Sequence, residues 1–248
     1  LNFSHGTHAE HLEKIRILRN LSKKLNLPIP ILQDLSGPKL RVGVLPPQGI
    51  ELIPGTVVRL KRYEHNESIE VSENTIPLEI PDVIAGLQPG SHILMDDGNL
   101  QFRILKAEMD EITAEVEIGG ILYSRKGVNL PGVALKIPGF TAKDQDDLEF
   151  GLQQNVDAVA VSFVRSSVDI LKVRQAIDHF ANDDNRYLPI IAKLELPDAI
   201  LNLEEILEAA DGVMVARGDL AVETSPSIVP ITQKEIIHTA NIKAKLVI

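Results

Sequence analysis

Residues 189–220, PIIAKLELPDAILNLEEILEAADGVMVARGDL, contain two apolar runs separated by a longer polar and apolar segment. The apolar runs are Pro189–Leu194 and Val213–Val215, and the segment between them predicts a helix over Pro197–Ala209. Apolar runs that alternate with helices are typical of parallel strands covered on both faces. We therefore predict two parallel strands joined by a helix in this stretch.

The same alternation continues through the chain from residue 132 onward. It predicts a strand at Ala158–Phe163 and the start of another at Lys245–Ile248. Helices are predicted at Lys143–Gln154, Val168–Phe180 and Ile231–Ala244. With about six strand–helix units visible, a (β/α)₈ barrel is favoured over an open sheet, although periodicity does not decide between them.

The first 38 residues repeat this pattern. Thr7 and Glu10 match a capping box, T-x-x-E, at the start of a helix whose leucines and isoleucines recur at helical spacing. Pro28 is expected to stop that helix. A short strand is predicted at Ile29–Leu32, ending near Asp34.

Residues 39–131 have a different pattern, because helical periodicity is absent and Pro-Gly, Asp-Gly and Gly-Gly turns separate short strands. The strands predicted here are Gly49–Leu52, Thr56–Leu60, His92–Met95, Leu100–Leu105 and Ile112–Glu117. We predict an α/β fold, a partial TIM (β/α)₈ barrel formed by residues 1–38 and 132–248 with a small β-barrel domain, residues 39–131, inserted into it. Since the chain starts at Leu1 and stops within an apolar run, the barrel is expected to be truncated at both ends.

The composition is that of a globular protein with an acidic surface. Acidic residues number 35 and basic residues 25, for a formal charge of −10. Such a chain repels nucleic acid and anionic membranes, and no apolar run approaches the ~18 residues of a membrane span, so neither partner is expected. The absence of cysteine excludes disulfides and thiolate metal sites. A cytoplasmic location is expected.

Charged residues follow two neighbouring predicted strands at their carboxyl ends. Lys193 and Glu195 are two positions apart, which places both side chains on the same face of a strand. Asp219 follows the next strand, and the carboxyl ends of barrel strands carry the chemistry. Two carboxylates without a nearby histidine or cysteine suit Mg²⁺ or Mn²⁺, and a lysine between them suits an oxyanion or a phosphoryl group. A salt bridge at the barrel rim is an equally weighted alternative.

Small polar side chains precede the first helix. Asn2, Ser4 and His5 lie where a helix N-terminus can bind an anion, but helix capping is the preferred explanation of Ser4 from the sequence alone. His5, His8 and His11 also form an H-x-x-H-x-x-H pattern. Metal binding by these histidines is a minor alternative, because no further ligand accompanies them.

Asp34 ends the first short strand, and two cations, Lys39 and Arg41, follow it. Arg41 is chemically suited to clamp a phosphate with two hydrogen bonds. Basic residues at a domain boundary are common, however, so the segment is also explained as a solvated hinge.

Taken together, these segments resemble pyruvate kinase. They occur in that family's order over essentially the whole chain, with a β domain inserted after the third barrel strand. Each motif alone is weak, but six in the same order are specific. The matching segments are Leu1–Thr7 (LNFSHGT), Asp34–Arg41 (DLSGPKLR), Asp96–Gly98 (DDG), Ser124–Pro131 (SRKGVNLP), Ile191–Glu195 (IAKLE) and Met214–Leu220 (MVARGDL).

The resemblance implies phosphoryl transfer from phosphoenolpyruvate to ADP, giving pyruvate and ATP in glycolysis. Glu195 and Asp219 would hold Mg²⁺ or Mn²⁺, and Lys193 would steady charge on the transferring phosphoryl group and on the enolate oxygen. The backbone N–H groups of Gly218 and Asp219 would meet the substrate carboxylate. Alignment and charge neutralisation are the main requirements of this chemistry.

The same resemblance implies a nucleotide side of the site. Arg41 and Lys126 would contact phosphates, which also makes Arg41 a catalytic candidate. The residues implied on this side are Asn2, Ser4, His5, Asp34, Arg41 and Lys126.

The chain departs from the family pattern where many members bind K⁺. In those members the ligands match Asn2, Ser4, Asp34 and the carbonyl oxygen of Leu35, with an acidic residue at the position of Lys39. Members with lysine at that position resemble the K⁺-independent branch, and a tethered ammonium can supply the charge that K⁺ otherwise brings. We therefore expect the parent enzyme to need Mg²⁺ but not K⁺.

Further departures concern the edges of the expected site. Ala221 replaces a usual glycine, and Leu196 follows the metal glutamate where a polar residue is commoner. The family's substrate-side arginine would precede Leu1 and its active-site threonine would follow Ile248. This chain alone is therefore expected to be an incomplete enzyme.

Two alternatives and one assembly prediction complete the sequence-based picture. A Mg²⁺-dependent pyruvate-enolate aldolase or lyase would use the same metal pair, although Lys126 and the Asn2–His5 segment are needed only if a nucleotide binds. A non-catalytic fragment that acts by association is the other alternative. The full-length protein is expected to be a homo-oligomer, a tetramer by resemblance.

Overall fold

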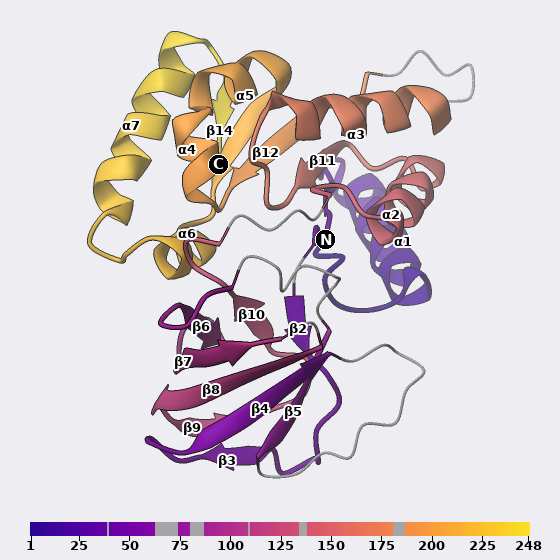
Figure 1. The fold of residues 1–248 in the computed structure, drawn as a ribbon. Helices are drawn as coiled ribbons and strands as arrows, with labels where there is room; N and C mark the ends of the chain where they lie inside the picture. Colours follow the sequence, from indigo (N-terminus) through magenta and orange to yellow (C-terminus); the bar gives the residue numbers. More distant parts are fainter. Residues whose placement is uncertain (39, 63–73, 80–86, 109, 134–137, 181–186) are drawn as a thin grey trace. The chain divides into compact units, whose positions relative to one another are not determined.

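The computed structural model describes residues 1–38, 40–62, 74–79, 87–108, 110–133, 138–180 and 187–248 (Figure 1). These residues form two compact units. The first unit consists of Leu1–Pro38, Pro138–Leu220 and Ser227–Ile248, and the second of Lys39–Ile137 and Ala221–Pro226. Each unit has a hydrophobic core of its own.

The first unit contains a five-stranded parallel sheet. Its strands lie in the order of the chain, each hydrogen-bonded to the next. They are β1 (Leu32–Asp34), β11 (Ala158–Val161), β12 (Ile190–Leu194), β13 (Gly212–Val215) and β14 (Leu246–Val247). The register pairs Asp34 with Ala160, and Lys193 with Met214. Because all five strands are parallel, their carboxyl ends lie at one edge of the sheet.

Helices connect these strands. They are α1 (His8–Leu25), α2 (Ala142–Gln153), α3 (Ser167–Phe180), α4 (Pro197–Leu201), α5 (Leu203–Ala209), α6 (Arg217–Glu223) and α7 (Val229–Ile242). Helix α2 packs beside α3, α3 beside α5, and α5 beside α7, so these helices follow the order of the strands (Figure 1). In the described part of the chain, no helix combines the length and the apolar character that a membrane span requires.

The start of α1 confirms the predicted capping box. The Thr7 side chain accepts a hydrogen bond from the N–H of Glu10, and the Glu10 carboxylate accepts one from the N–H of Thr7 at 2.6 Å. The helix ends at Asn26, whose left-handed backbone (φ 49°) closes the last turn before Pro28 is reached. On the inner face of α1, His11 and Ile15 are buried.

The strand predicted at Ile29–Leu32 is wrong in its position, because β1 begins only at the last residue of that run. Pro28 and Pro30 have no backbone N–H and cannot donate to a strand ladder. Ile31 is buried, but its N–H donates to Asp157 Oδ2 at 2.7 Å rather than to a neighbouring strand. The apolar run therefore contributes core residues ahead of the strand.

The single helix predicted over Pro197–Ala209 is wrong, because α4 and α5 meet at Asn202. The backbone of Asn202 is not helical (φ −103°, ψ 20°), and its side-chain amide donates to the carbonyl oxygen of Arg165 at 2.9 Å. Such a side-chain bond competes with continued helix. The sequence also gave no sign of α6, which begins at Arg217 directly after β13.

The second unit contains a closed β barrel, which confirms the predicted mixed α/β class with a small β barrel. Among the described residues its seven strands pair in the order β10-β2-β5-β4-β8-β7-β6, and β6 pairs with β10 to close it. They are β2 (Leu40–Val42), β4 (Val57–Arg62), β5 (Thr75–Glu79), β6 (His92–Met95), β7 (Leu100–Ala107), β8 (Glu111–Ile118) and β10 (Gly127–Asn129). The neighbours are antiparallel except for β4 and β5, which are parallel.

The core of this unit follows from alternation along its strands. Every second residue at the start of β7 is buried, including Phe102 and Ile104, and Ile112 and Ala114 of β8 are buried in the same way. A separate two-stranded sheet pairs β3 (Ile50–Leu52) with β9 (Gly120–Leu122). The strands predicted for this region from the sequence are all present.

Candidate active site

The carboxyl ends of β1 and β12 bring charged side chains together at one edge of the parallel sheet. Asp34 is the last residue of β1, and Glu195 directly follows β12. Lys193 is the penultimate residue of β12, and its side chain reaches both carboxylates. Asp34 is far from Lys193 and Glu195 in the sequence and meets them because parallel strands present the same end on one side.

Lys193 is the central charge of this cluster. Its Nζ atom lies 2.8 Å from Glu195 Oε1 and 3.1 Å from Asp34 Oδ1, and it donates to Ser162 Oγ at 2.8 Å. The side chain is 13% exposed. Burial by itself lowers the pKa of Lys193, but Glu195 and Asp34 outweigh that effect and hold the pKa above its ordinary value. The ammonium therefore stays charged across the physiological pH range.

Glu195 is a buried carboxylate, with its side chain only 1% exposed. Its Oε2 atom accepts a hydrogen bond from the backbone N–H of Phe163 at 2.7 Å. Burial raises the pKa of Glu195, the charge of Asp219 raises it further, and Lys193 opposes both effects without cancelling them. A cation bound beside this buried carboxylate would stabilise its charged form.

The loop after β11 shapes the floor of the site. Ser162 is buried, and its hydroxyl donates to the carbonyl oxygen of Leu35 at 2.7 Å while accepting from Lys193. Phe163 has a left-handed backbone (φ 54°), an uncommon conformation for a bulky residue that is often found at functional sites. This conformation accompanies the hydrogen bond from its N–H to Glu195.

Gly37 explains how closely the loop after β1 approaches this region. A Cβ atom at Gly37 would lie 2.9 Å from the Phe163 ring and 3.1 Å from Ser162 Cβ, and its own backbone is left-handed (φ 65°). Only glycine meets both conditions without displacing its neighbours.

Sequence reasoning missed Ser162 and Phe163. The available signal was position, since both end the predicted strand Ala158–Phe163 and therefore reach the same edge as Lys193 and Glu195. Phe163 contributes through its backbone N–H, which no side-chain pattern can reveal.

Asp219 and Gly218 lie in the first turn of α6. The N–H of Leu220 donates to the carbonyl oxygen of Ala216 at 3.0 Å, so the N–H groups of the preceding three residues come before the helical ladder. A side-chain carbon added at Gly218 would meet no described atom within 4 Å, which leaves open space beside its backbone. First-turn N–H groups of a helix are suited to an anionic ligand.

The donor set fits a hard divalent cation. Glu195 follows β12 and Asp219 lies in the first turn of α6 after the neighbouring strand β13, so both carboxylates lie at the carboxyl edge of the parallel sheet. Within the described ranges, no three or more His, Cys, Asp or Glu side chains are grouped so as to hold a metal ion. Mg²⁺ is commonly bound by one or two carboxylates and completes its shell with water and substrate phosphate oxygens. The pair is therefore sufficient for such an ion without a third protein carboxylate.

The N-terminal segment lies beside Asp34. Asn2 forms a parallel bridge with Asp34, and the N–H of Phe3 donates to the Asp34 carbonyl oxygen at 2.9 Å. The Asn2 side chain accepts from the N–H of Ser4 at 2.8 Å, and Ser4 Oγ lies 3.5 Å from Ser36 Oγ. The structure thus places the Asn2–Ser4 segment beside Asp34.

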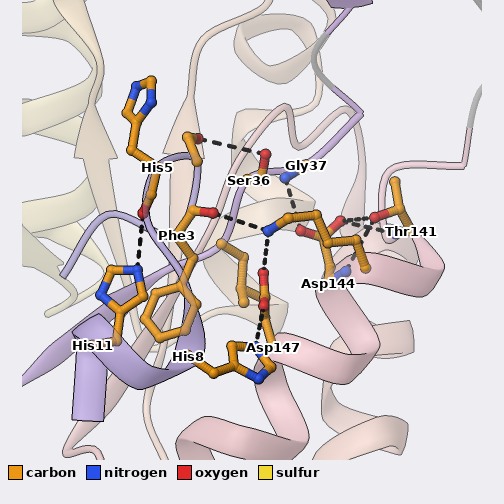
Figure 2. Close-up of polar contacts among 12 residues, drawn as sticks. Phe3, His5, His8, His11, Ser36, Gly37, Thr141, Asp144 and Asp147 are labelled. Atoms are coloured by element: carbon orange, nitrogen blue, oxygen red, sulfur yellow. Dashed lines mark hydrogen bonds and ion pairs between the residues drawn. The ribbon is translucent and has the colours of Figure 1, made fainter. Parts of the chain in front are cut away.

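The side chains of the three N-terminal histidines do not converge on one point (Figure 2). His5 is exposed, and its carbonyl oxygen accepts from His11 Nε2 at 2.9 Å. His8 Nε2 lies 2.7 Å from Asp147 Oδ1. The H-x-x-H-x-x-H pattern therefore reflects structural contacts in the described residues rather than a shared metal.

The remaining predicted residues belong to the second unit. Arg41, on β2, donates to the carbonyl oxygen of Arg125 at 3.1 Å. Lys126 Nζ lies 2.7 Å from Asp96 Oδ1, and the hydrogen bond and charge of that carboxylate raise the pKa of Lys126. Lys39 lies outside the described residues.

Several curated proteins named pyruvate kinase match the entire chain. The pyruvate kinase of Agrobacterium vitis is 42% identical over 249 residues, covering 100% of this chain and 49% of that protein. That of Thermococcus litoralis is 41% identical over 248 residues, covering 100% of this chain and 50% of the relative. That of Staphylococcus epidermidis is 39% identical over 250 residues, covering 100% of this chain and 41% of the relative.

The chain thus spans half or less of the length of these relatives. The sequence model of the family described as "Pyruvate kinase, barrel domain" matches residues 1–248. The chain belongs to the pyruvate kinase barrel-domain family.

Proposed function

We propose that the full-length protein is a pyruvate kinase that transfers a phosphoryl group from phosphoenolpyruvate to ADP, giving pyruvate and ATP. One observation carries this proposal, the Lys193 ammonium 2.8 Å from the buried carboxylate of Glu195 at the carboxyl edge of the parallel sheet. It provides a fixed cation beside a carboxylate that favours a metal ion, and the family match gives the chemistry for which such a pair is used. The match does not favour the aldolase or lyase alternative.

The fold proposal is that the five parallel strands are part of a TIM (β/α)₈ barrel. Their sequential order and their connecting helices support it, because a barrel winds its strands in chain order. In this proposal residues 1–38 and 132–248 belong to the barrel domain, and residues 39–131 form an inserted lid domain. The separate cores of the two compact units support a division of this kind.

Glu195 and Asp219 are the residues we assign to Mg²⁺ or Mn²⁺. The bound ion would neutralise charge on the substrate phosphate and on the enolate oxygen. In its neighbourhood, Lys193 holds a positive charge where the phosphoryl group passes between donor and acceptor. The N–H groups of Gly218 and Asp219 orient the substrate by binding its carboxylate.

The nucleotide side is assigned to residues of both units. Asn2, Ser4, His5 and Asp34 are assigned to it by resemblance, and the bridge between Asn2 and Asp34 supports this assignment. Arg41 and Lys126 are assigned to phosphates because of their fixed charge, and Arg41 also to catalysis. An acidic chain needs such local cations to bind two anionic substrates.

The proposed activity is tested by measuring pyruvate formation from phosphoenolpyruvate by the full-length protein with Mg²⁺. The expected result is a rate that requires both ADP and the metal and vanishes with EDTA. Pyruvate formation that is independent of ADP would contradict the proposal and favour a lyase.

We further propose that the enzyme does not require K⁺, and the support for this is the lysine at position 39 in the sequence. The rate with Mg²⁺ is expected to change less than twofold, roughly, when KCl replaces tetramethylammonium chloride at constant ionic strength. Lys39→Glu is expected to make the rate K⁺-dependent. Strong activation of the unaltered enzyme by K⁺ would contradict the proposal. By resemblance we also propose a homotetramer for the full-length protein.

A further inference from the structure

Helix α2 carries two buried acids that have no part in the proposed chemistry, Asp144 and Asp147 (Figure 2). They are three positions apart and therefore lie on the same side of the helix. Asp144 caps the start of α2 through Thr141 and also accepts the N–H of Gly37 at 2.9 Å. Asp147 points toward the N-terminal segment, which is the stretch assigned to the nucleotide.

Asp147 contacts two basic side chains while its own side chain is only 5% exposed. Its Oδ1 atom lies 2.7 Å from His8 Nε2, and its Oδ2 atom lies 2.5 Å from Lys143 Nζ. Lys143 Nζ donates in addition to the carbonyl oxygen of Phe3 at 2.9 Å. Asp147 therefore holds α1 directly and the N-terminal segment through one lysine.

Phe3 is fixed at its backbone and at its ring. Its N–H donates to the carbonyl oxygen of Asp34, and its carbonyl oxygen accepts from Lys143. Its ring is buried and stacks on His11, with ring centroids 4.0 Å apart and planes 11° apart. Asn2 and Ser4 flank Phe3, so their orientation depends on how Phe3 is held.

The backbone of Asp147 ties the same helix to β1. Its carbonyl oxygen accepts from Gln33 Nε2 at 2.6 Å, and Gln33 is fully buried immediately before Asp34. One residue of α2 thus contacts the strand that ends in Asp34 and, through Lys143, the segment that carries Asn2 and Ser4.

An ordinary helical ion pair does not account for this arrangement. Lys143 and Asp147 have the i,i+4 spacing of a surface pair, which stabilises a helix only slightly. In a surface pair, however, the carboxylate is in water and the lysine has no protein partner other than that carboxylate. Here the carboxylate is buried, and the lysine reaches a backbone carbonyl of another segment.

We propose that Asp147 is a positioning residue that, through Lys143 and His8, orders the Leu1–His5 segment for ADP. The inference rests on the proposed function, because it assumes that this segment faces the nucleotide. It predicts an effect on ADP and not on phosphoenolpyruvate. Phosphoenolpyruvate is assigned to Lys193 and to the first turn of α6, and none of the described contacts of Asp147 reaches either of them.

The test is the variant Asp147→Asn in the full-length protein, with Michaelis constants measured for each substrate. Loss of a charge-assisted hydrogen bond is expected to raise the KM for ADP about tenfold, while the KM for phosphoenolpyruvate changes less than about twofold. Lys143→Met, at a half-exposed side chain, is expected to give the same selective change. The double variant is expected to show no more than the larger single effect, because both residues act through one contact.

Asp211→Asn is the matched control, because Asp211 is also an acid that ties chain segments together. It accepts from the N–H of Ile190 at 2.8 Å and pairs with Arg174 at the opposite edge of the same sheet. This variant is expected to lower the melting temperature without changing the ratio of the two Michaelis constants.

The outcomes are distinct. A selective increase for ADP in both Asp147→Asn and Lys143→Met supports the inference. Unchanged Michaelis constants, or a parallel change for both substrates like that of a merely destabilised protein, overturns it. Calorimetric binding of ADP gives the same comparison without turnover, so absence of pyruvate formation in the unaltered protein is recognised separately as failure of the proposed function.

Discussion

Lys193 and Glu195 form a close charged pair that is largely removed from water. Removing two charges from water is costly, and the cost is offset only when the pair is close and further hydrogen bonds are made. Here Ser162 and the N–H of Phe163 provide those bonds. Burial raises the pKa of Glu195, and Lys193 and the N–H of Phe163 oppose that rise.

A metal role for Glu195 predicts a change in ion affinity. Substitutions of outer-sphere partners already weaken metal binding by 10- to 100-fold, so Glu195→Gln is expected to lower the affinity for Mn²⁺ by about 100-fold or more. Electron paramagnetic resonance of free Mn²⁺ with the full-length protein measures this affinity. Glu208→Gln, at an exposed side chain, is the control. An unchanged Mn²⁺ affinity in Glu195→Gln would show that the carboxylate is not a ligand.

His11 links the folding stability of the protein to pH. Burial lowers the pKa of His11, the hydrogen bond to the His5 carbonyl opposes this, and Lys14 lowers it further. Because the folded-state pKa lies below the unfolded value of about 6.5, the unfolded state binds more protons in that window. The stability that neutral His11 provides is therefore complete above about pH 6.5 and is lost as the pH falls.

Urea unfolding of the unaltered chain and of His11→Gln, measured between pH 5 and pH 8, tests this linkage. The advantage of the unaltered chain in unfolding free energy is expected to shrink as the pH falls below about 6.5. An advantage that stays constant or grows toward acid pH would show that His11 is not the titrating group.

Residues with side-chain chemistry were the predictable part of the site. Lys193 and Glu195 stand at the end of β12, and Asp219 follows β13 in the first turn of α6, so each is conspicuous as a charged residue after an apolar run. Ser162 was not predictable, because a serine after a strand is ordinary, and the N–H of Phe163 has no signature in the sequence at all.

At the scale of elements, α2 depends on the absence of a side chain at Gly151. A Cβ atom there would lie 1.9 Å from Gln33 Oε1 and 2.5 Å from its Cδ. Gln33 is fully buried and its amide donates to Asp147, so it has no free space into which to move. The helix therefore approaches β1 closely only with glycine at this position.

Gly151→Ala is expected to lower the unfolding free energy by about 1–3 kcal/mol, although alanine in a helix ordinarily stabilises. Denaturant titration measures the difference. Gly218→Ala is a control for stability, because its added carbon meets no described atom within 4 Å. An unchanged or higher stability of Gly151→Ala would contradict the close packing of α2 on β1.

Elements were predictable from periodicity where local sequence dominates. The capping box of Thr7 and Glu10 located the start of α1 to the residue. The break at Asn202 was not predictable, because it depends on a hydrogen bond to Arg165 from a distant segment. The misplaced first strand was avoidable, since Pro28 and Pro30 cannot donate to a ladder.

In the whole molecule, helical periodicity and turn dipeptides along the sequence distinguished an α/β part from a β part. The pairing within the β barrel could not be read in the same way. Hairpin turns indicate antiparallel neighbours, whereas β4 and β5 are parallel and β6 closes the barrel on β10. Such long-range pairings depend on the folded structure rather than on local residues. The role of Lys39 in place of K⁺ stays a prediction from the sequence alone.

The proposed function assigns phosphoryl transfer to the Lys193 ammonium at the carboxyl end of β12. The measurement that tests it most directly is the turnover number for pyruvate formation by the full-length protein and by Lys193→Met, at saturating phosphoenolpyruvate, ADP and Mg²⁺. Lys172→Met, an exposed lysine on α3, is the control for loss of a charge. We predict a fall of about 10²- to 10³-fold in Lys193→Met and none in the control. A folded Lys193→Met protein that retains more than about a tenth of the turnover would contradict the account.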